Sequence, residues 1–125
     1  WTRARQRLAA RYVDAFATSG ASNGSHPALT LPAIDARAEA VWHLFVVQVE
    51  QRDGLVDFLH RRGIEAGVHY PLPLHLQPAY EHLEVPAHSL PVSEDAAQRV
   101  LSLPLYAELS AAQRDQVLAV LKPIA

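Results

Sequence analysis

Hydrophobic side chains recur every three or four positions near the start of the chain, which is the period of an amphipathic helix. Leu8, Tyr12 and Phe16 fall four residues apart, while arginines occupy much of the opposite face. The pattern predicts a helix over residues 2–19, with Thr2 as its N-cap. The arginines then form a solvated helix face rather than a phosphate-binding patch.

A continuous apolar run follows further along the chain. Residues 41–49, VWHLFVVQV, are β-branched and aromatic and are apolar on both faces, which predicts a central strand covered on at least one side. We expect His43 within this strand to be a packed, hydrogen-bonded core residue. Asp53 is expected to cap a ten-residue helix that Gly63 closes. Residues 64–70, IEAGVHY, then complete a strand–helix–strand unit.

The remaining segments indicate loops and short elements. Residues 21–27, ASNGSHP, are typical of a loop. Ser93 is expected to start a short helix with acidic residues in its first turn, and residues 102–106 to form a short strand or extended edge. Ser110 and Gln113 match a capping box at the start of a final helix. The predicted fold class is therefore α+β: a small two-layer domain with a sheet of about three strands and helices packed mainly on one face.

One loop differs in composition from the rest of the chain. Residues 67–80, GVHYPLPLHLQPAY, contain two histidines, two tyrosines and three prolines at the end of the second predicted strand. The segment could be a connection that only turns a corner, or a stiff loop whose polar side chains face a ligand. Ligands of α/β sheets favour the carboxyl ends of strands, and this position favours the second interpretation.

Composition and charge narrow the function classes. The chain has 125 residues, half of them hydrophobic, which fits one globular domain. Its formal net charge of −2 gives no electrostatic basis for binding nucleic acid or an anionic membrane. The absence of cysteine excludes a disulfide framework and a thiolate nucleophile, and the absence of a signal peptide and of a long apolar run predicts a cytoplasmic protein. Methionine is absent as well, even at position 1, and we expect the chain to be a fragment of a longer one.

Residues that could carry catalysis are few. The chain lacks a glycine-rich phosphate loop, a G-x-S-x-G elbow and an H-E-x-x-H motif. The spacing of His69, His75, His82 and His88 is wider than that of usual zinc ligands, so we expect no metal site. The only lysine, Lys122, lies in the last helical turn, where a lysine usually satisfies helix carbonyl groups. We therefore expect no catalytic residues and no self-contained catalytic machinery in this chain.

Two long segments resemble the C-terminal part of a known enzyme family. The segments HLFVVQVEQRDGLVDFLHRRGIEAGVHYPLPLHLQPAY and LPVSEDAAQRVLSLPLYAELSAAQRDQVLAVL are similar to the DegT/DnrJ/StrS sugar-nucleotide aminotransferases, which are fold-type I pyridoxal-phosphate enzymes. The elements that carry the resemblance are Arg52-Asp53, Gly63-Ile64, His69-Tyr70-Pro71, His75, Gln77-Pro78-Ala79-Tyr80 and Ser102-Leu103-Pro104-Leu105. By this resemblance, residues 1–20 are a helix leading out of a missing large domain, and residues 21–125 are the small C-terminal domain.

The resemblance also implies a division of roles. In the family, the large domain binds pyridoxal 5'-phosphate, so we expect the cofactor in the full-length enzyme and not on this fragment. The small domain closes the cleft and helps to bind a nucleotide-sugar substrate, and we expect His69, Tyr70 and His75 to contact that substrate. Each of these three could instead have a structural role, and Tyr80 is expected to pack under the following helix. The full-length enzyme is expected to be a homodimer that also takes an amino donor.

Two alternatives remain open at this point. Some relatives with the same fold replace the cofactor-bearing lysine and dehydrate sugars instead of aminating them. The chain could also be a free-standing, non-catalytic binding module, which equally has no need of a catalytic lysine. In the leading interpretation, the fragment alone is inactive and belongs to an aminotransferase acting on a nucleotide-linked keto sugar.

Overall fold

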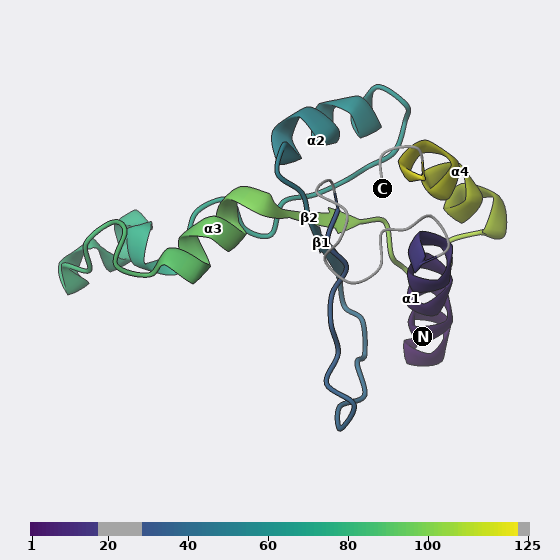
Figure 1. Ribbon diagram of the computed structural model, residues 1–125, viewed down its shortest axis with the longest axis horizontal. Coiled ribbons are helices and arrows are strands. Elements are labelled where there is room, and N and C mark those ends of the chain that lie inside the picture. Colours follow the sequence, from purple (N-terminus) through teal and green to yellow (C-terminus); the bar gives the residue numbers. More distant parts are fainter. Residues whose placement is uncertain (18–28, 123–125) are drawn as a thin grey trace.

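The centre of the fold is a two-stranded antiparallel sheet (Figure 1). Its strands are β1 (Phe45–Gln48) and β2 (Val100–Leu103), paired so that Phe45 lies opposite Leu103. Single bridges extend the sheet on both sides, from Thr30 to Gln48 and from Gly67 to Ser102. The computed structural model describes residues 1–17 and 29–122, so the predicted loop at 21–27 lies outside the described residues.

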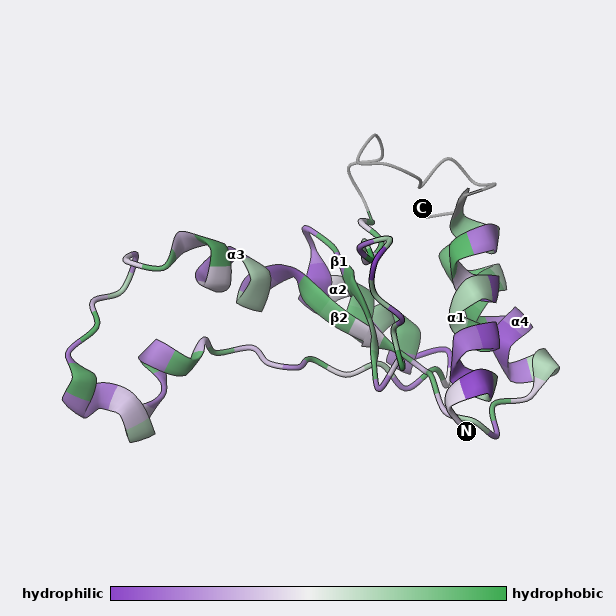
Figure 2. Ribbon diagram, turned by 90° about the horizontal axis from the view of Figure 1, so that it is seen from below, coloured by the Kyte–Doolittle hydropathy of each residue, from purple (hydrophilic) through white to green (hydrophobic). Residues whose placement is uncertain are grey.

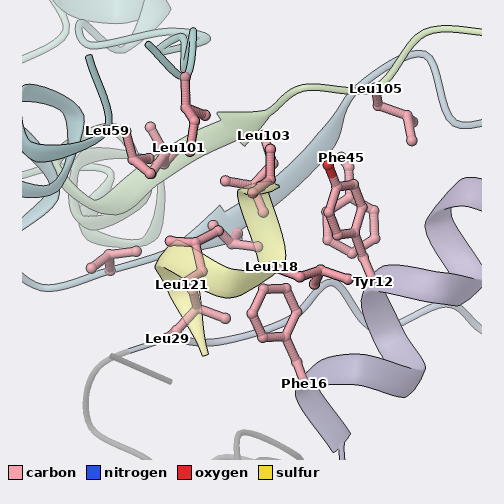
Figure 3. Close-up of a cluster of buried hydrophobic side chains, with 14 of the residues drawn as sticks. Tyr12, Phe16, Leu29, Phe45, Leu59, Leu101, Leu103, Leu105, Leu118 and Leu121 are labelled. Atoms are coloured by element: carbon pink, nitrogen blue, oxygen red, sulfur yellow. The ribbon is translucent and has the colours of Figure 1, made fainter. Parts of the chain in front are cut away.

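Three helices cover one face of this sheet. They are α1 (Thr2–Ala17), α2 (Arg52–His60) and α4 (Ala111–Leu121), and each contributes buried side chains to a single hydrophobic core. Residues on alternate positions of a strand point to the same side, so Phe45 and Val47 face the same core as their partners on β2. The core residues labelled in Figure 3 are Tyr12, Phe16, Leu29, Phe45, Leu59, Leu101, Leu103, Leu105, Leu118 and Leu121. The packing confirms a small α+β domain with helices mainly on one face.

A long arm projects from this body. It comprises residues 70–99 and contains the 3₁₀ helices η1 (Leu74–Leu76) and η2 (Pro78–Leu83), followed by α3 (Pro91–Arg99) (Figures 1 and 2). Hydrophobic and polar residues alternate irregularly along it in Figure 2, and Ala97 is its one buried residue within the described chain. The arm therefore adds little to the core and instead extends away from it.

A buried arginine joins the arm to the body. The side chain of Arg52, at the start of α2, is 9% exposed. One of its guanidinium nitrogens lies 3.2 Å from the carbonyl oxygen of Ala97 and 3.4 Å from that of Val100, and another donates to the carboxylate of Asp53. Because α3 passes directly into β2 at these carbonyl groups, the guanidinium holds the junction between the two elements.

The predicted strands are longer than the observed ones. β1 covers only four of residues 41–49, because Trp42 adopts a left-handed backbone with φ of 54° that interrupts the extended chain. His43 precedes the strand and is exposed, so its prediction as a core residue was wrong. Residues 64–70 contribute one bridge at Gly67 rather than a third strand.

Some helix ends also differ from prediction. α1 begins at Thr2, and the carbonyl of Trp1 accepts the first helical bond from Arg5, so Thr2 is a helical residue rather than the N-cap. Asp53 lies in the first turn of α2 instead of capping it. α3 begins at Pro91, before Ser93, because proline suits the first position of a helix, where an N–H has no partner.

Two predicted helix signals are confirmed. Gly63 has φ of 70° and follows α2 in the left-handed conformation that glycine adopts without strain. The Ser110 side chain accepts a bond from the Gln113 N–H while the Gln113 side chain accepts from the Ser110 N–H, which is a complete capping box. None of the described helices has the length and apolar character required to cross a membrane.

Candidate functional site

A pocket of about 610 Å³ lies between the proline-rich loop and one face of α3. On α3 its wall is formed by Ser93, Ala96 and Ala97, whose spacing of three and four places them on the same helix face, and Val100 at the start of β2 continues this wall. On the loop, His69, Tyr70 and His75 all line it. The structure thus brings the three residues predicted to contact substrate to one pocket.

The prolines shape the loop around this pocket. Pro73 precedes η1 with an extended backbone, and Pro78 occupies the first turn of η2. Proline restricts φ to about −65° and so limits the conformations open to each turn. Tyr80, which was expected to pack under the next helix, lies in η2, is 40% exposed and lines the pocket.

His69 is held at the pocket by the sheet. Its Nδ1 lies 2.9 Å from the hydroxyl oxygen of Ser102, a 5% exposed residue of β2. Ser102 is also bridged to Gly67 by two backbone hydrogen bonds. A β-carbon on Gly67 would lie 2.7 Å from Cε1 of the His69 ring, so glycine leaves the space that the ring occupies. The ring of Tyr70 meets that of His69 edge-on at 5.5 Å and is 70% exposed as a residue.

His75 is arranged differently. Its Nε2 lies 3.1 Å from the Glu94 carboxylate, and the two side chains are only 7% and 12% exposed. Glu94 also accepts hydrogen bonds from the backbone N–H groups of His88 and Leu90. Partial burial alone would raise the pKa of Glu94, but these bonds outweigh burial and hold its pKa below the usual value. His75 therefore ties the proline-rich loop to α3 as well as lining the pocket.

The residues around the pocket do not fit pyridoxal phosphate. Its lining contains no lysine, arginine or carboxylate, so it lacks an amine for a Schiff base and the lysine or arginine side chain that usually pairs with a phosphate. Lys122 lies elsewhere, exposed just after the last turn of α4, where its N–H donates to the Leu118 carbonyl. Within residues 1–17 and 29–122, no group of three or more metal-binding side chains is placed to hold an ion.

Two residues that contact the pocket histidines were not predicted as part of the site. Ser102 and Glu94 orient His69 and His75, respectively, from positions 33 and 19 residues away. Ser102 belongs to the Ser102-Leu103-Pro104-Leu105 element of the resemblance, and Glu94 is one of the acidic residues expected in the first turn of the helix at Ser93. No local spacing signals either contact, because each depends on how the loop folds back on a later element.

The amino-acid sequence of the chain matches a known protein family and its members. The model of the DegT/DnrJ/EryC1/StrS aminotransferase family matches residues 1–122. The dTDP-3-amino-3,4,6-trideoxy-alpha-D-glucose transaminase of Streptomyces venezuelae is 40% identical over 124 residues, which are 99% of this chain and 30% of that protein.

Solved structures agree with the sequence matches. The crystal structure of S. venezuelae DesV in complex with a ketimine intermediate superimposes with a TM-score of 0.88 and 37% identity, covering 98% of this chain and 31% of that one. The structure of NtdA from Bacillus subtilis with bound cofactor PMP gives a TM-score of 0.77 and 28% identity, covering 98% and 28%. The chain thus spans about 30% of the length of the proteins it matches.

Proposed function

The chain belongs to the DegT/DnrJ/EryC1/StrS aminotransferase family, and from this premise we propose that it is the C-terminal domain of a pyridoxal-phosphate-dependent aminotransferase acting on a nucleotide-linked keto sugar. Residues 21–125 would form the small domain, and residues 1–20 the helix that leads out of the large one. The domain contributes to cleft closure and to substrate binding. The full-length protein is proposed to be a homodimer that also takes an amino donor.

The pocket beside His69 carries this proposal. Its walls combine apolar surfaces, from Leu72, Leu74 and Ala96, with polar groups at His69 and Gln77. A sugar ring presents C–H faces and hydroxyl groups, so a mixed lining of this kind suits it. Because the lining holds no lysine or arginine, we assign the pocket to the sugar and not to the diphosphate of the substrate.

The cofactor belongs outside this pocket. The lining residues offer it neither an amine nor a phosphate site, so in the proposal it is bound by the rest of the full-length protein. When bound there, pyridoxal phosphate supplies the electron sink for amino transfer. The residues of this chain position the sugar and help to exclude water when the cleft closes.

Substitution of His69 in the full-length protein tests the proposal. We expect His69→Ala to lower kcat/KM for the nucleotide sugar between about twofold and a hundredfold, the loss of one ligand hydrogen bond. The half-reaction with the amino donor should change far less, because the donor is small and reacts beside the cofactor. The matched control is His82→Ala, an exposed histidine on η2 outside the pocket lining, which should change neither half-reaction.

The opposite pattern would contradict the proposal. If His69 only supports the fold, His69→Ala should lower the melting temperature and slow both half-reactions in parallel. A destabilised enzyme with unchanged preference among sugar substrates would show that the pocket does not hold the sugar.

A further inference from the structure

The environment of His69 leaves one of its ring nitrogens unused. Nδ1 faces the Ser102 hydroxyl at 2.9 Å, while Nε2 has no hydrogen-bond partner within the described part of the chain. The ring lies over Gly67, which has no side chain to displace it, and it lines the pocket. The free nitrogen is therefore the one available to a ligand.

The hydrogen-bonding capacity of Ser102 decides which nitrogen carries the proton. A hydroxyl group has one donor and two acceptor sites. Among residues 1–17 and 29–122, His69 is the only hydrogen-bond partner of the Ser102 hydroxyl, which belongs to a 5% exposed residue. If His69 donated from Nδ1, the serine hydroxyl would have no acceptor in this part of the chain, and buried donors without partners are rarer than buried acceptors with spare capacity.

We infer that Ser102 is a positioning residue that donates to Nδ1 and holds neutral His69 in the tautomer protonated at Nε2. His69 then presents an N–H donor to the pocket. Given the proposed function, on which this step rests, the substrate atom facing His69 is an acceptor oxygen, a hydroxyl or keto oxygen of the sugar. Ser102 itself does not line the pocket, so it acts only through the histidine.

Nitrogen NMR of the histidine rings tests the inference directly. The ¹⁵N-labelled chain would be measured at about pH 8, where histidine is neutral because its usual pKa is about 6.5. His69→Gln assigns the signals of His69 by their loss. We expect wild type to show a protonated Nε2 and an unprotonated Nδ1, and Ser102→Ala to show a mixture of the two tautomers.

Two further variants separate positioning from folding. Ser102→Thr keeps the hydroxyl in a strand, where β-branched residues are favoured, and should restore the wild-type signals. Ser89→Ala removes an exposed hydroxyl that bonds to the Pro86 carbonyl, and should leave His69 unchanged. If wild type shows a protonated Nδ1, or if Ser102→Ala leaves the tautomer as in wild type, the inference is overturned.

Activity of the full-length protein distinguishes this inference from the function it rests on. Ser102→Ala should lower kcat/KM for the nucleotide sugar about two- to tenfold, and should add nothing to the loss caused by His69→Ala. The half-reaction with the amino donor should stay unchanged. A fixed Nε2–H tautomer with an unchanged sugar half-reaction in His69→Ala would uphold the positioning role of Ser102 and contradict the proposed substrate role of the pocket.

Discussion

Glu94 connects three segments of the arm through one carboxylate. It accepts bonds from His75 and from the backbone at His88 and Leu90. A carboxyl group whose pKa is lowered in the folded state stabilises that state above its unfolded pKa, and the contribution is lost as pH falls through the folded value. The ionised form of Glu94 should therefore hold the arm together at neutral pH and lose this effect in acid.

The variant Glu94→Gln measures this contribution. We expect it to be less stable than wild type to urea at pH 7, and the difference to shrink as pH falls below about 4.3, the usual value for glutamate. Glu81→Gln, at an exposed glutamate of η2, should show no such trend. A difference between Glu94→Gln and wild type that stays constant from neutral to acidic pH would contradict the assignment.

Local signals placed some residues correctly and others wrongly: the capping box of Ser110 and Gln113 is confirmed, whereas His43 is exposed. The composition of the proline-rich loop indicated a ligand-facing loop, the family resemblance pointed to His69, Tyr70 and His75, and these three residues line one pocket. Ser102 could not be identified in this way, because its contact with His69 depends on the bridge between Gly67 and β2. A single sequence contains no periodic pattern for such a bridge.

The start of α4 is stabilised by a reciprocal cap whose contribution can be measured. The capping box at Ser110 satisfies two N–H groups at the start of α4, which carries buried residues of the core. We expect Ser110→Ala to lower the free energy of unfolding by about 1 kcal/mol, the usual cost of losing such a cap. Urea denaturation of Ser110→Ala, Gln113→Ala and the double variant should show coupling between the two sites, and strictly additive losses would contradict the reciprocal cap.

Two segments predicted as strands pair over fewer residues than their composition indicates. Residues 41–49 are apolar throughout, but the left-handed backbone at Trp42 ends the extended segment before β1 begins. Residues 64–70 have a strand-like composition, yet β2 pairs with them only at Gly67. Hydrophobic pattern records which segments can be buried, whereas strand length depends on which partner each segment finds. The fold class was therefore predictable and the strand ends were not.

At the scale of the whole molecule, the body and the arm should differ in stability. The body contains the buried core, while the residues of η1 and η2 are all exposed or half-buried. Local opening needs less free energy where few apolar groups are buried. We expect hydrogen exchange to be on the order of a hundredfold faster at the hydrogen-bonded amides of η1 and η2 than at those between β1 and β2. Equal protection of the two regions would show that the arm belongs to the same cooperative unit as the core.

Arg52 controls how the arm is oriented relative to the body. Its guanidinium contacts the carbonyl groups of Ala97 and Val100, where α3 meets the body. This contact fixes the point about which the arm could turn. With a rise of about 1.5 Å per residue, a pivot of about 10° at this point would swing the far end of α3 by about 2 Å. Because Glu94 on α3 lies 3.1 Å from His75 on the proline-rich loop, the loop should move together with the helix. The direction in which the whole arm points is thus set by the buried side chain of Arg52, which does not line the pocket.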